Sequence, residues 1–485
     1  MTDTPYSTSP RSPATRAVAA AAVFVASLLP WLISSDVPKL IARQREVLMG
    51  RYSVDWMTTL IILTLIMWGI AFGIARPSKP SGRQRVFRIA TAVVATVITL
   101  AATDVLCRMI QSPRYIEHTV QQRTSWPGDR VKDVIRRRPA DIHYEITYTD
   151  QPEHRRSYPG APPGFGTVRI DLTTDHRGYR NQHRLDDYDV VVLGDSFAEG
   201  SRVDDKEPWP VLLAARTGRT VYNLGISGGS PRYYLAALRN HGLALQPETI
   251  ICMIYEGNDF RTRRTKTSAS DRSWWDRIWD SPIRGSLKGA MIRLLGGLNA
   301  DRDVPHTEGL SWIPVEVPAE SSVFYAFPPK RLTRLDYDPQ RFPSSRRWRD
   351  TARELEQIID LCREKGIDLH FAYAPSKPHV IMPLVRDRVA AAALHAFVAF
   401  KKDDLPPPPE YKERFYARID TLEHTLSAFC REKDVGFINP TSALRGAMAE
   451  GRQVYYSYDQ HWTSIGHEVV VDVMLEHLDR HASGH

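Results

Sequence analysis

The sequence has few of the residues that build metal clusters or disulfide frameworks. Its 485 residues include only four cysteines, at positions 107, 252, 362 and 430, and no two of them lie close together in the sequence. This spacing excludes a metal site of the CxxC kind. We expect free thiols, and Cys362 and Cys430 could pair only if the fold brings them together. Zinc-finger spacing, a P-loop and internal repeats are also absent, and we predict no metal and no cofactor.

Acidic residues are in a minority, and this bears on the partners of the protein. There are 64 lysine and arginine residues against 56 aspartate and glutamate residues, a formal net charge of +8. Many basic residues flank apolar runs, which membrane association explains more simply than nucleic-acid binding. The apolar share of 42 % and the charged share of 25 % are ordinary for a globular protein. We therefore expect a folded core, a membrane partner and no nucleic acid.

Three long apolar runs lie in the first 107 residues. They occupy residues 17–35, 56–75 and 89–107, and each is close to the ~20 residues that cross a bilayer as a helix. A buried core helix is the alternative for any single run, and Asp104 makes the third run the weakest. Three such runs together favour a transmembrane anchor formed by residues 1–107.

The basic residues between the second and third runs predict the orientation of this anchor. The connecting segment carries no acidic residue, and its basic residues are Arg76, Lys79, Arg83, Arg85 and Arg88. Such a segment should stay in the cytoplasm. Three crossings then place the chain after Cys107 on the outer side, and the result is the same if the first run is a cleaved signal peptide.

Beyond the anchor, the pattern changes to alternating strands and helices. We interpret residues 108–184 as a linker and a strand-rich lead-in, with alternating segments at 142–148 and 167–172. Residues 185–485 predict an α/β fold with a five-stranded parallel sheet covered on both faces. The predicted strands are 188–193, 220–224, 249–255, 368–373 and 435–438, and the predicted helices are 209–217, 232–242, 346–365, 413–433 and 464–480. Ligands bind beyond the carboxyl ends of the strands in such sheets.

Two insertions interrupt this alternation, at about residues 261–345 and 400–411. In the shorter one, the prolines of Asp403–Pro409 predict an extended spacer. In the longer one, Ser273–Leu298 carries an apolar, tryptophan-rich stripe beside basic residues. That stripe fits equally well a helix in the bilayer interface and a helix packed over the core.

Three short motifs follow predicted strands. The first, Gly194-Asp195-Ser196-Phe197, places a serine on a tight turn, where its hydroxyl can reach a substrate and its backbone N–H can face an oxyanion. The next two strands are followed by Asn223-Leu224-Gly225-Ile226-Ser227-Gly228 and by Gly257-Asn258-Asp259. In these, a glycine backbone N–H and the side-chain N–H of Asn258 could donate to an oxyanion. Each motif alone is also typical of an ordinary turn.

A fourth motif, Asp459-Gln460-His461-Trp462, precedes the last predicted helix. A D-x-H sequence alone could be a metal ligand pair or a surface loop. A serine hydroxyl needs a base to take its proton, however, and an imidazole needs a carboxylate to fix its tautomer. Because all four motifs fall on one rim of the predicted sheet, we predict Ser196 as nucleophile, His461 as base and Asp459 as the acid that orients it.

Together the four motifs resemble the four sequence blocks of the SGNH (GDSL-like) hydrolase superfamily, over about residues 175–478 without the insertions. The resemblance implies a flavodoxin-like three-layer fold, serine esterase chemistry, and an oxyanion hole formed by Ser196, Gly228 and Asn258. Two departures stand out. Glu256 occupies a position that is usually glycine, and the late pair is D-x-H rather than D-x-x-H, with Tyr458 where the more distant acid would be.

The D-x-H-W form is more similar to the SGNH domains of bacterial polysaccharide O-acetylation proteins, although there the pair precedes the serine. We therefore expect a membrane-anchored esterase that acts on O-acyl, above all O-acetyl, esters of cell-envelope carbohydrate or lipid. Its catalytic domain would lie on the periplasmic side of a bacterial inner membrane. The alternatives are an O-acetyltransferase supplied by a separate membrane acyl-donor protein, and a non-catalytic glycan-binding or assembly module.

Overall fold

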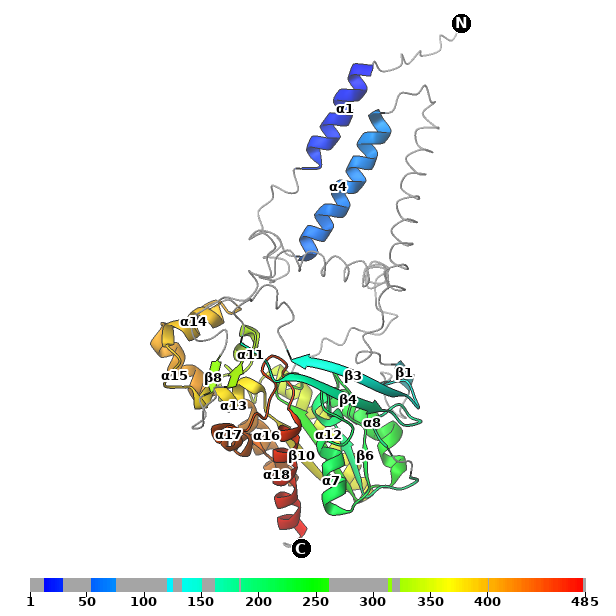
Figure 1. Ribbon diagram of the computed structural model, residues 1–485, viewed down its shortest axis with the longest axis vertical. Helices are drawn as coiled ribbons and strands as arrows, with labels where there is room; N and C mark the ends of the chain where they lie inside the picture. Colours follow the sequence, from blue (N-terminus) through cyan, green and yellow to red (C-terminus); the bar gives the residue numbers. More distant parts are fainter. Residues whose placement is uncertain are drawn as a thin grey trace. The chain divides into compact units, whose positions relative to one another are not determined.

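The computed structural model describes residues 13–28, 54–75, 120–124, 133–150, 162–182, 185–260, 313–315, 323–399 and 401–482. These residues fall into two compact units (Figure 1). The first contains helices α1 (Pro13–Ala26) and α4 (Val54–Ala75), and the second contains every other described element.

In the first unit, α1 and α4 pack against each other. The rings of Phe24 and Trp68 stack with centroids 5.3 Å apart, and Trp68 Nε1 donates to Ser27 Oγ at 3.1 Å. Helix α4 covers the second predicted apolar run, residues 56–75. Helix α1 begins before the first predicted apolar run, residues 17–35, and ends before that run does. Within the described parts of the chain, no helix combines the length and apolar character that a bilayer crossing requires. The third run and the tryptophan-rich segment 273–298 lie outside the described residues.

The second unit is built on a five-stranded parallel sheet, as predicted. Its strand order is β11-β10-β7-β5-β6, and neighbouring strands pair in parallel, for example from Asp368 opposite Thr249 to Ala374 opposite Tyr255. The strands are β5 (Val190–Leu193), β6 (Val221–Asn223), β7 (Thr249–Tyr255), β10 (Asp368–Ala374) and β11 (Gly436–Ile438). The order reverses between β5 and β7, which is where open α/β sheets bind their ligands.

Helices cover both faces of this sheet because successive strand residues point to opposite sides. In β5, Val190 and Val192 belong to one buried cluster, and Val191 and Leu193 belong to the other. Packed in the first cluster are α7 (Trp209–Thr217), α13 (Lys377–Leu384), α14 (Ala391–Ala399), α15 (Pro408–Arg418), α17 (Thr441–Ala449) and α18 (Ser464–Ala482). Packed in the second are α8 (Pro231–Ala237), α12 (Arg346–Lys365) and α16 (Thr421–Glu432). The predicted three-layer arrangement is therefore confirmed.

Short antiparallel pairs lie beside the sheet. The two alternating segments of the lead-in form a hairpin, β3 (His143–Asp150) with β4 (Gly166–Thr173) (Figure 1). The other pairs are β1 (Val120–Thr124) with β2 (Asp133–Arg137), and β8 (Ile313–Val315) with β9 (Val323–Tyr325). Short helices complete the unit: α6 (Ser196–Glu199), a π-helical turn (Leu238–Gly242), a 3₁₀ turn (Leu243–Leu245) and α11 (Pro329–Thr333).

Two sequence predictions about helices were wrong. The single helix expected over 413–433 is two helices, α15 and α16, divided at Asp420. The carboxylate of Asp420 bonds to Nε2 of His379 at 2.8 Å, and Thr421 Oγ1 donates to the carbonyl of Tyr337 at 3.0 Å. These contacts outside the helix outweigh the helical periodicity.

The proline spacer also ends earlier than expected. Pro408 and Pro409 begin α15, because the first turn of a helix tolerates residues that lack an N–H. The three described cysteines are buried and free, as predicted, and Cys107 lies outside the described residues.

Candidate active site

Ser196 is the first residue of α6, directly beyond the carboxyl end of β5. Asp195 caps this short helix by accepting a hydrogen bond from the backbone N–H of Phe197 at 3.0 Å. A side chain at Gly194 would place its Cβ only 2.5 Å from the Cβ of Ala198, so the sharp turn from strand to helix requires glycine. The helix ends at Gly200, whose left-handed backbone favours glycine. The turn therefore carries its own structural supports.

Ser196, His461 and Asp459 form one hydrogen-bonded chain. The Oγ of Ser196 lies 2.8 Å from Nε2 of His461, and Nδ1 of His461 lies 2.5 Å from Oδ1 of Asp459. The backbone N–H of His461 donates to the same carboxylate oxygen at 2.9 Å. With its Nδ1 proton held by Asp459, the neutral imidazole presents its Nε2 lone pair to the serine hydroxyl. The predicted convergence of Ser196 with the distant pair Asp459 and His461 is present in the structure.

The carboxylate of Asp459 stays ionised although it is largely buried. Burial opposes the charge, but the nearby imidazole, its hydrogen bonds and the guanidinium of Arg202 together hold the pKa of Asp459 well below its ordinary value. Arg202 Nε donates to Oδ2 of Asp459 at 3.1 Å. A permanent negative charge beside His461 favours the imidazolium that forms when the serine proton is taken.

Aromatic contacts hold the histidine motif against the serine turn. The ring of Phe197 lies 5.1 Å from that of His461 and 4.7 Å, edge to face, from that of Trp462. Trp462 also pairs with Tyr455 through an isolated β-bridge, which closes the loop that carries Asp459. These contacts give the tryptophan of the D-x-H-W motif a structural role.

Asn258 reaches the serine turn through Asp195. Its Nδ2 donates to Oδ2 of Asp195 at 2.8 Å, and its buried Oδ1 has no hydrogen-bond partner among the residues that the structure describes. Asp195 is fully buried, which raises its pKa to about 6, although the hydrogen bonds from Phe197 and Asn258 and the nearby imidazole favour its charged form. In the sequence, Asp195 is typical of an ordinary turn residue. The structure makes it the partner that orients the Asn258 amide.

Gly228 lies on a loop that two contacts fix beside the same turn. The backbone N–H of Ile226 donates to the carbonyl of Gly194 at 3.2 Å, and that of Ser227 donates to Oε2 of Glu199 at 3.1 Å. Gly228 itself has a left-handed φ of 72°, which glycine adopts at no steric cost. The loop that carries Gly228 is therefore bonded to the turn that carries Ser196.

The lead-in supplies a buried ion pair beneath this loop. Arg138 Nε donates to Oε1 of Glu199 at 2.6 Å, and both side chains are about 98 % buried or more. Burial disfavours the Glu199 carboxylate, but the charge and hydrogen bond of Arg138 outweigh it and lower the pKa of Glu199. Arg136, on β2, donates to the carbonyl of Gly228 at 3.1 Å. Residues before the sheet therefore position the loop that carries Gly228.

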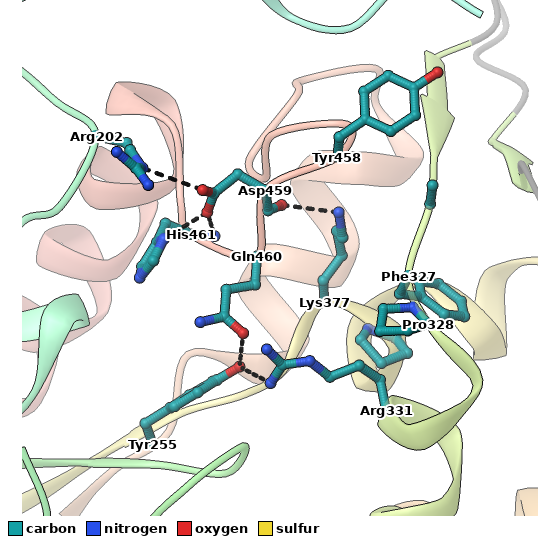
Figure 2. A pocket seen from close by; sticks show the side chains of 12 residues that line it. Arg202, Tyr255, Phe327, Pro328, Arg331, Lys377, Tyr458, Asp459, Gln460 and His461 are labelled. Atoms are coloured by element: carbon teal, nitrogen blue, oxygen red, sulfur yellow. Dashed lines mark hydrogen bonds and ion pairs between the residues drawn. The ribbon is translucent and has the colours of Figure 1, made fainter. Parts of the chain in front are cut away.

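Lys377 holds the loop of Asp459 by its carbonyl groups (Figure 2). Its Nζ donates to the carbonyls of Tyr456, Ser457 and Asp459 at 3.0, 2.7 and 2.8 Å. Burial, with a further contribution from the positive charge of Arg331, lowers the pKa of Lys377 to about 7. All three donors of the ammonium are occupied by the loop.

Asp150, the last residue of β3, holds the same loop by its amide groups. Its carboxylate accepts from the backbone N–H groups of Ser457, Tyr458 and Asp459 at 2.7, 3.1 and 3.1 Å, and from that of Phe165 at 3.0 Å. The loop is therefore fixed from both sides. Nothing in the local sequence of Asp150 or Lys377 pointed to this role, because each acts on a segment far away in the chain.

Glu256 is buried in a network of its own. Its carboxylate accepts from the hydroxyl of Tyr373 at 2.5 Å and the backbone N–H of Ser376 at 2.9 Å, and it lies 2.7 Å from Nδ1 of His379. The turn after β7 still forms, with the N–H of Asp259 bonded to the carbonyl of Tyr255 at 3.1 Å. The presence of Glu256 where glycine is usual therefore leaves Asn258 at the site, as expected.

A cavity of about 280 Å³ opens beside His461 (Figure 2). Its walls come from the loop of Asp459, the end of β7, the segment after α6, the start of α13, and the segment from β9 into α11. The lining residues are Arg202, Tyr255, Ala326, Phe327, Pro328, Arg331, Lys377, Pro378, Tyr458, Asp459, Gln460 and His461. Its volume is near the lower end of small-molecule sites, ~300–1,000 Å³.

Side-chain donors that lie close enough to hold a metal ion occur in three groups of described residues. They are Asp368, His370 and His481; His143, Glu145 and Asp171; and His379, Asp420 and Glu423. None of these groups contains Ser196, Asp459 or His461. The chemistry of the triad itself needs only a hydroxyl, an imidazole and a carboxylate.

A parallel α/β sheet with a serine, a histidine and an aspartate linked at the carboxyl ends of its strands defines the class of serine hydrolases. The sequence model of the GDSL-like Lipase/Acylhydrolase family matches residues 192–469, more than half of the chain. The chain belongs to this family, whose members are esterases and acylhydrolases, and it is an enzyme of that kind.

The chain is similar to several solved structures at low identity. A G-D-S-L family lipolytic protein from Desulfitobacterium hafniense is 11 % identical, with 59 % of this chain and 96 % of that chain covered and a TM-score of 0.28. A GDSL-like lipase from Bacteroides thetaiotaomicron is 12 % identical, with 60 % and 87 % covered and a TM-score of 0.26. A hydrolase from a Lake Arreo metagenome is 13 % identical, with 60 % and 94 % covered and a TM-score of 0.29. A comparison with curated proteins gave no match.

Proposed function

We propose that this enzyme hydrolyses O-acyl esters, above all O-acetyl esters, of cell-envelope carbohydrate or lipid through an acyl-enzyme on Ser196. The observation that carries the proposal is the continuous chain from the Ser196 hydroxyl through His461 to Asp459, with contacts of 2.8 and 2.5 Å. The polar cavity beside His461 offers space for a small sugar-like group.

The reaction divides into two transfers. In the first, Ser196 Oγ bonds to the acyl carbon while its proton passes to Nε2 of His461. The ester C–O bond then breaks, and the alcohol leaves with that proton. In the second, water gives a proton to His461 and attacks the acyl-enzyme, and the acid leaves as Ser196 regains its proton. The backbone N–H groups of Ser196 and Gly228 and the amide of Asn258 would stabilise the oxyanion, at ~3 kcal/mol for one donor.

Membrane anchoring is part of the proposal. It is supported by the three apolar runs, by the basic segment between the second and third, and by apolar side chains exposed on α1 and α4, such as Val18 at 68 % and Leu65 at 57 %. The distribution of charge favours a catalytic domain on the periplasmic side of a bacterial inner membrane.

Transfer to a second hydroxyl is the alternative outcome of the same acyl-enzyme. The cavity lies on the histidine side of the site, where an acceptor sugar could replace water, with acyl groups supplied by a membrane acyl-donor protein. Product analysis separates the two reactions: free acetate indicates hydrolysis, and an acetylated acceptor indicates transfer.

The test compares the purified protein with Ser196→Ala on p-nitrophenyl acetate and on a panel of acetylated envelope polymers. We expect the variant to lose about 10⁴- to 10⁶-fold in kcat. A folded Ser196→Ala protein that still releases acetate at the wild-type rate would refute the proposed mechanism.

A further inference from the structure

One wall of the cavity beside His461 comes from outside the sheet. The residues of this wall are Ala326, Phe327 and Pro328, which join β9 to α11, and Arg331 of α11. The backbone N–H of Ala326 donates to the carbonyl of Ser457 at 2.8 Å, so the wall is attached to the same loop that carries Asp459. Any group that fills the cavity contacts both the wall and the catalytic loop.

The charges that line this cavity do not balance. Among the described residues that line it, Arg202, Arg331 and Lys377 are cationic and Asp459 is acidic. Arg202 is paired with Asp459, and the ammonium of Lys377 donates to three carbonyls. Arg331 forms no ion pair with a carboxylate among the described residues. Arg331 is therefore the cation of this lining that has neither a paired carboxylate nor a full set of hydrogen bonds within the described part of the chain.

Arg331 is held in place by a neutral partner. Its Nη1 donates to the hydroxyl of Tyr255 at 3.0 Å, and that hydroxyl lies 3.2 Å from Oε1 of Gln460, the neighbour of His461 (Figure 2). Burial raises the pKa of Tyr255 to about 12, even with Arg331 beside it, so the phenol does not neutralise the guanidinium. A guanidinium has five N–H donors, and this bond uses one of them.

We infer that Arg331 forms a subsite for an anionic group, a carboxylate or a phosphate, carried by the alcohol part of the ester. The planar guanidinium matches both anions with two parallel hydrogen bonds, and Tyr255 and Gln460 fix its distance from His461. The enzyme would then prefer acyl esters of acidic alcohols, such as acidic sugars, to neutral ones. This inference rests on the proposed function and specifies its substrate class.

The experiment uses the full-length protein and three acetyl esters that differ in one substituent: 4-acetoxybenzoate, its neutral methyl ester, and 4-acetoxyphenyl phosphate. Each is assayed with the wild type and with Arg331→Gln, Arg331→Lys and Lys330→Gln. Lys330→Gln removes the same charge from α11, but Lys330 is exposed and does not line the cavity. Because each ester is compared across proteins, differences in intrinsic reactivity cancel.

We expect Arg331→Gln to lower kcat/KM about 10- to 100-fold on an anionic ester, the range of a charge-assisted hydrogen bond. The neutral ester should change less than about twofold, Arg331→Lys should recover part of the loss, and Lys330→Gln should resemble the wild type. The ester with the larger loss identifies the preferred anion, and equal losses indicate a subsite open to both.

Two results would overturn the inference: equal losses on charged and neutral esters, or no loss on either anion. If a variant folds poorly, a binding assay on the wild type tests the inference instead. Competitive inhibition of the wild type by 4-hydroxybenzoate should be several-fold stronger than inhibition by its methyl ester, and equal inhibition would also overturn the inference. Loss of neutral-ester hydrolysis in Ser196→Ala tests the proposed function separately, so the two can fail independently.

Discussion

The two parts of the candidate catalytic machinery are held in place in different ways. The Ser196 turn is supported locally, by the cap from Asp195 and the close packing of Gly194. The loop of Asp459 and His461 depends on distant residues: the amide of Asp459 bonds to Asp150, 309 positions earlier, and its carbonyl bonds to Lys377. The sequence motifs contain the reactive groups of both parts. They contain the supporting residues of the Ser196 turn only.

The largest loss of activity should come from Asp150→Asn, which alters a distant support of the loop that carries Asp459. The substitution replaces one acceptor oxygen with an N–H₂ group that faces buried backbone N–H groups. We expect kcat/KM to fall about 100-fold and stability to drop by roughly 2–4 kcal/mol, because a buried group left unsatisfied costs ~1–3 kcal/mol. Ester hydrolysis and denaturant unfolding measure the two quantities.

Glu145→Gln is the matched control for Asp150→Asn, since Glu145 lies on the same strand but forms an exposed ion pair with Arg169. It should leave activity and stability unchanged. An Asp150→Asn protein with wild-type kcat/KM would show that the loop keeps its geometry without the lead-in.

Lys377→Met should have the next largest effect. Methionine fills similar space but gives no hydrogen bonds to the three carbonyls. We expect kcat/KM to fall about 10-fold and stability to drop by roughly 1–3 kcal/mol, because the carbonyls lose their donor while the cost of burying a charge is also removed. A large loss of stability with full activity would reverse this assignment.

Asp195→Asn tests the other part of the machinery, because Asp195 is a local support of the Ser196 turn. The new side chain can still cap α6, but it no longer offers Asn258 a carboxylate. We expect about a 10-fold loss in kcat and a stability change near 1 kcal/mol. Asn258→Ala should cause a larger loss, about 100-fold for one oxyanion donor, and the double variant should be no worse than Asn258→Ala. Additive losses would mean that Asp195 does not act through Asn258.

The smallest effect on the catalytic machinery is expected at His379, which lies away from the triad. Its titration should make the stability of the fold depend on pH. Burial disfavours a charge on His379, but the nearby Glu256 carboxylate and the hydrogen bond with Asp420 raise its pKa from 6.5 to about 10. Protonation of His379 thus stabilises the fold fully below pH 6.5, and this stability is lost as the pH rises through about 10. The free energy of unfolding of the wild type should fall more steeply between pH 7 and 10 than that of His379→Gln. Parallel curves would contradict this assignment.

The parts of the fold and site that could be predicted depended on local patterns. β7, α7 and α12 occupy the residues that periodicity predicted, and Ser196, Asn258, Asp459 and His461 stood out because each motif follows a strand or precedes a helix. The break at Asp420 and the roles of Asp150 and Lys377 depend on contacts between segments far apart in the chain. Such contacts leave no periodic or motif signal in a single sequence. Arg331 was missed because it lies in an insertion without a recognisable pattern.

The most direct test of the central claim is fluorophosphonate labelling of the folded protein, with the modified residue located by mass spectrometry. If His461 and Asp459 activate the serine, the wild type should be labelled at Ser196, and His461→Gln should lose labelling at that position while unfolding at a similar temperature. Equal labelling of Ser196 in the two proteins, or no labelling of the folded wild type, would contradict the account.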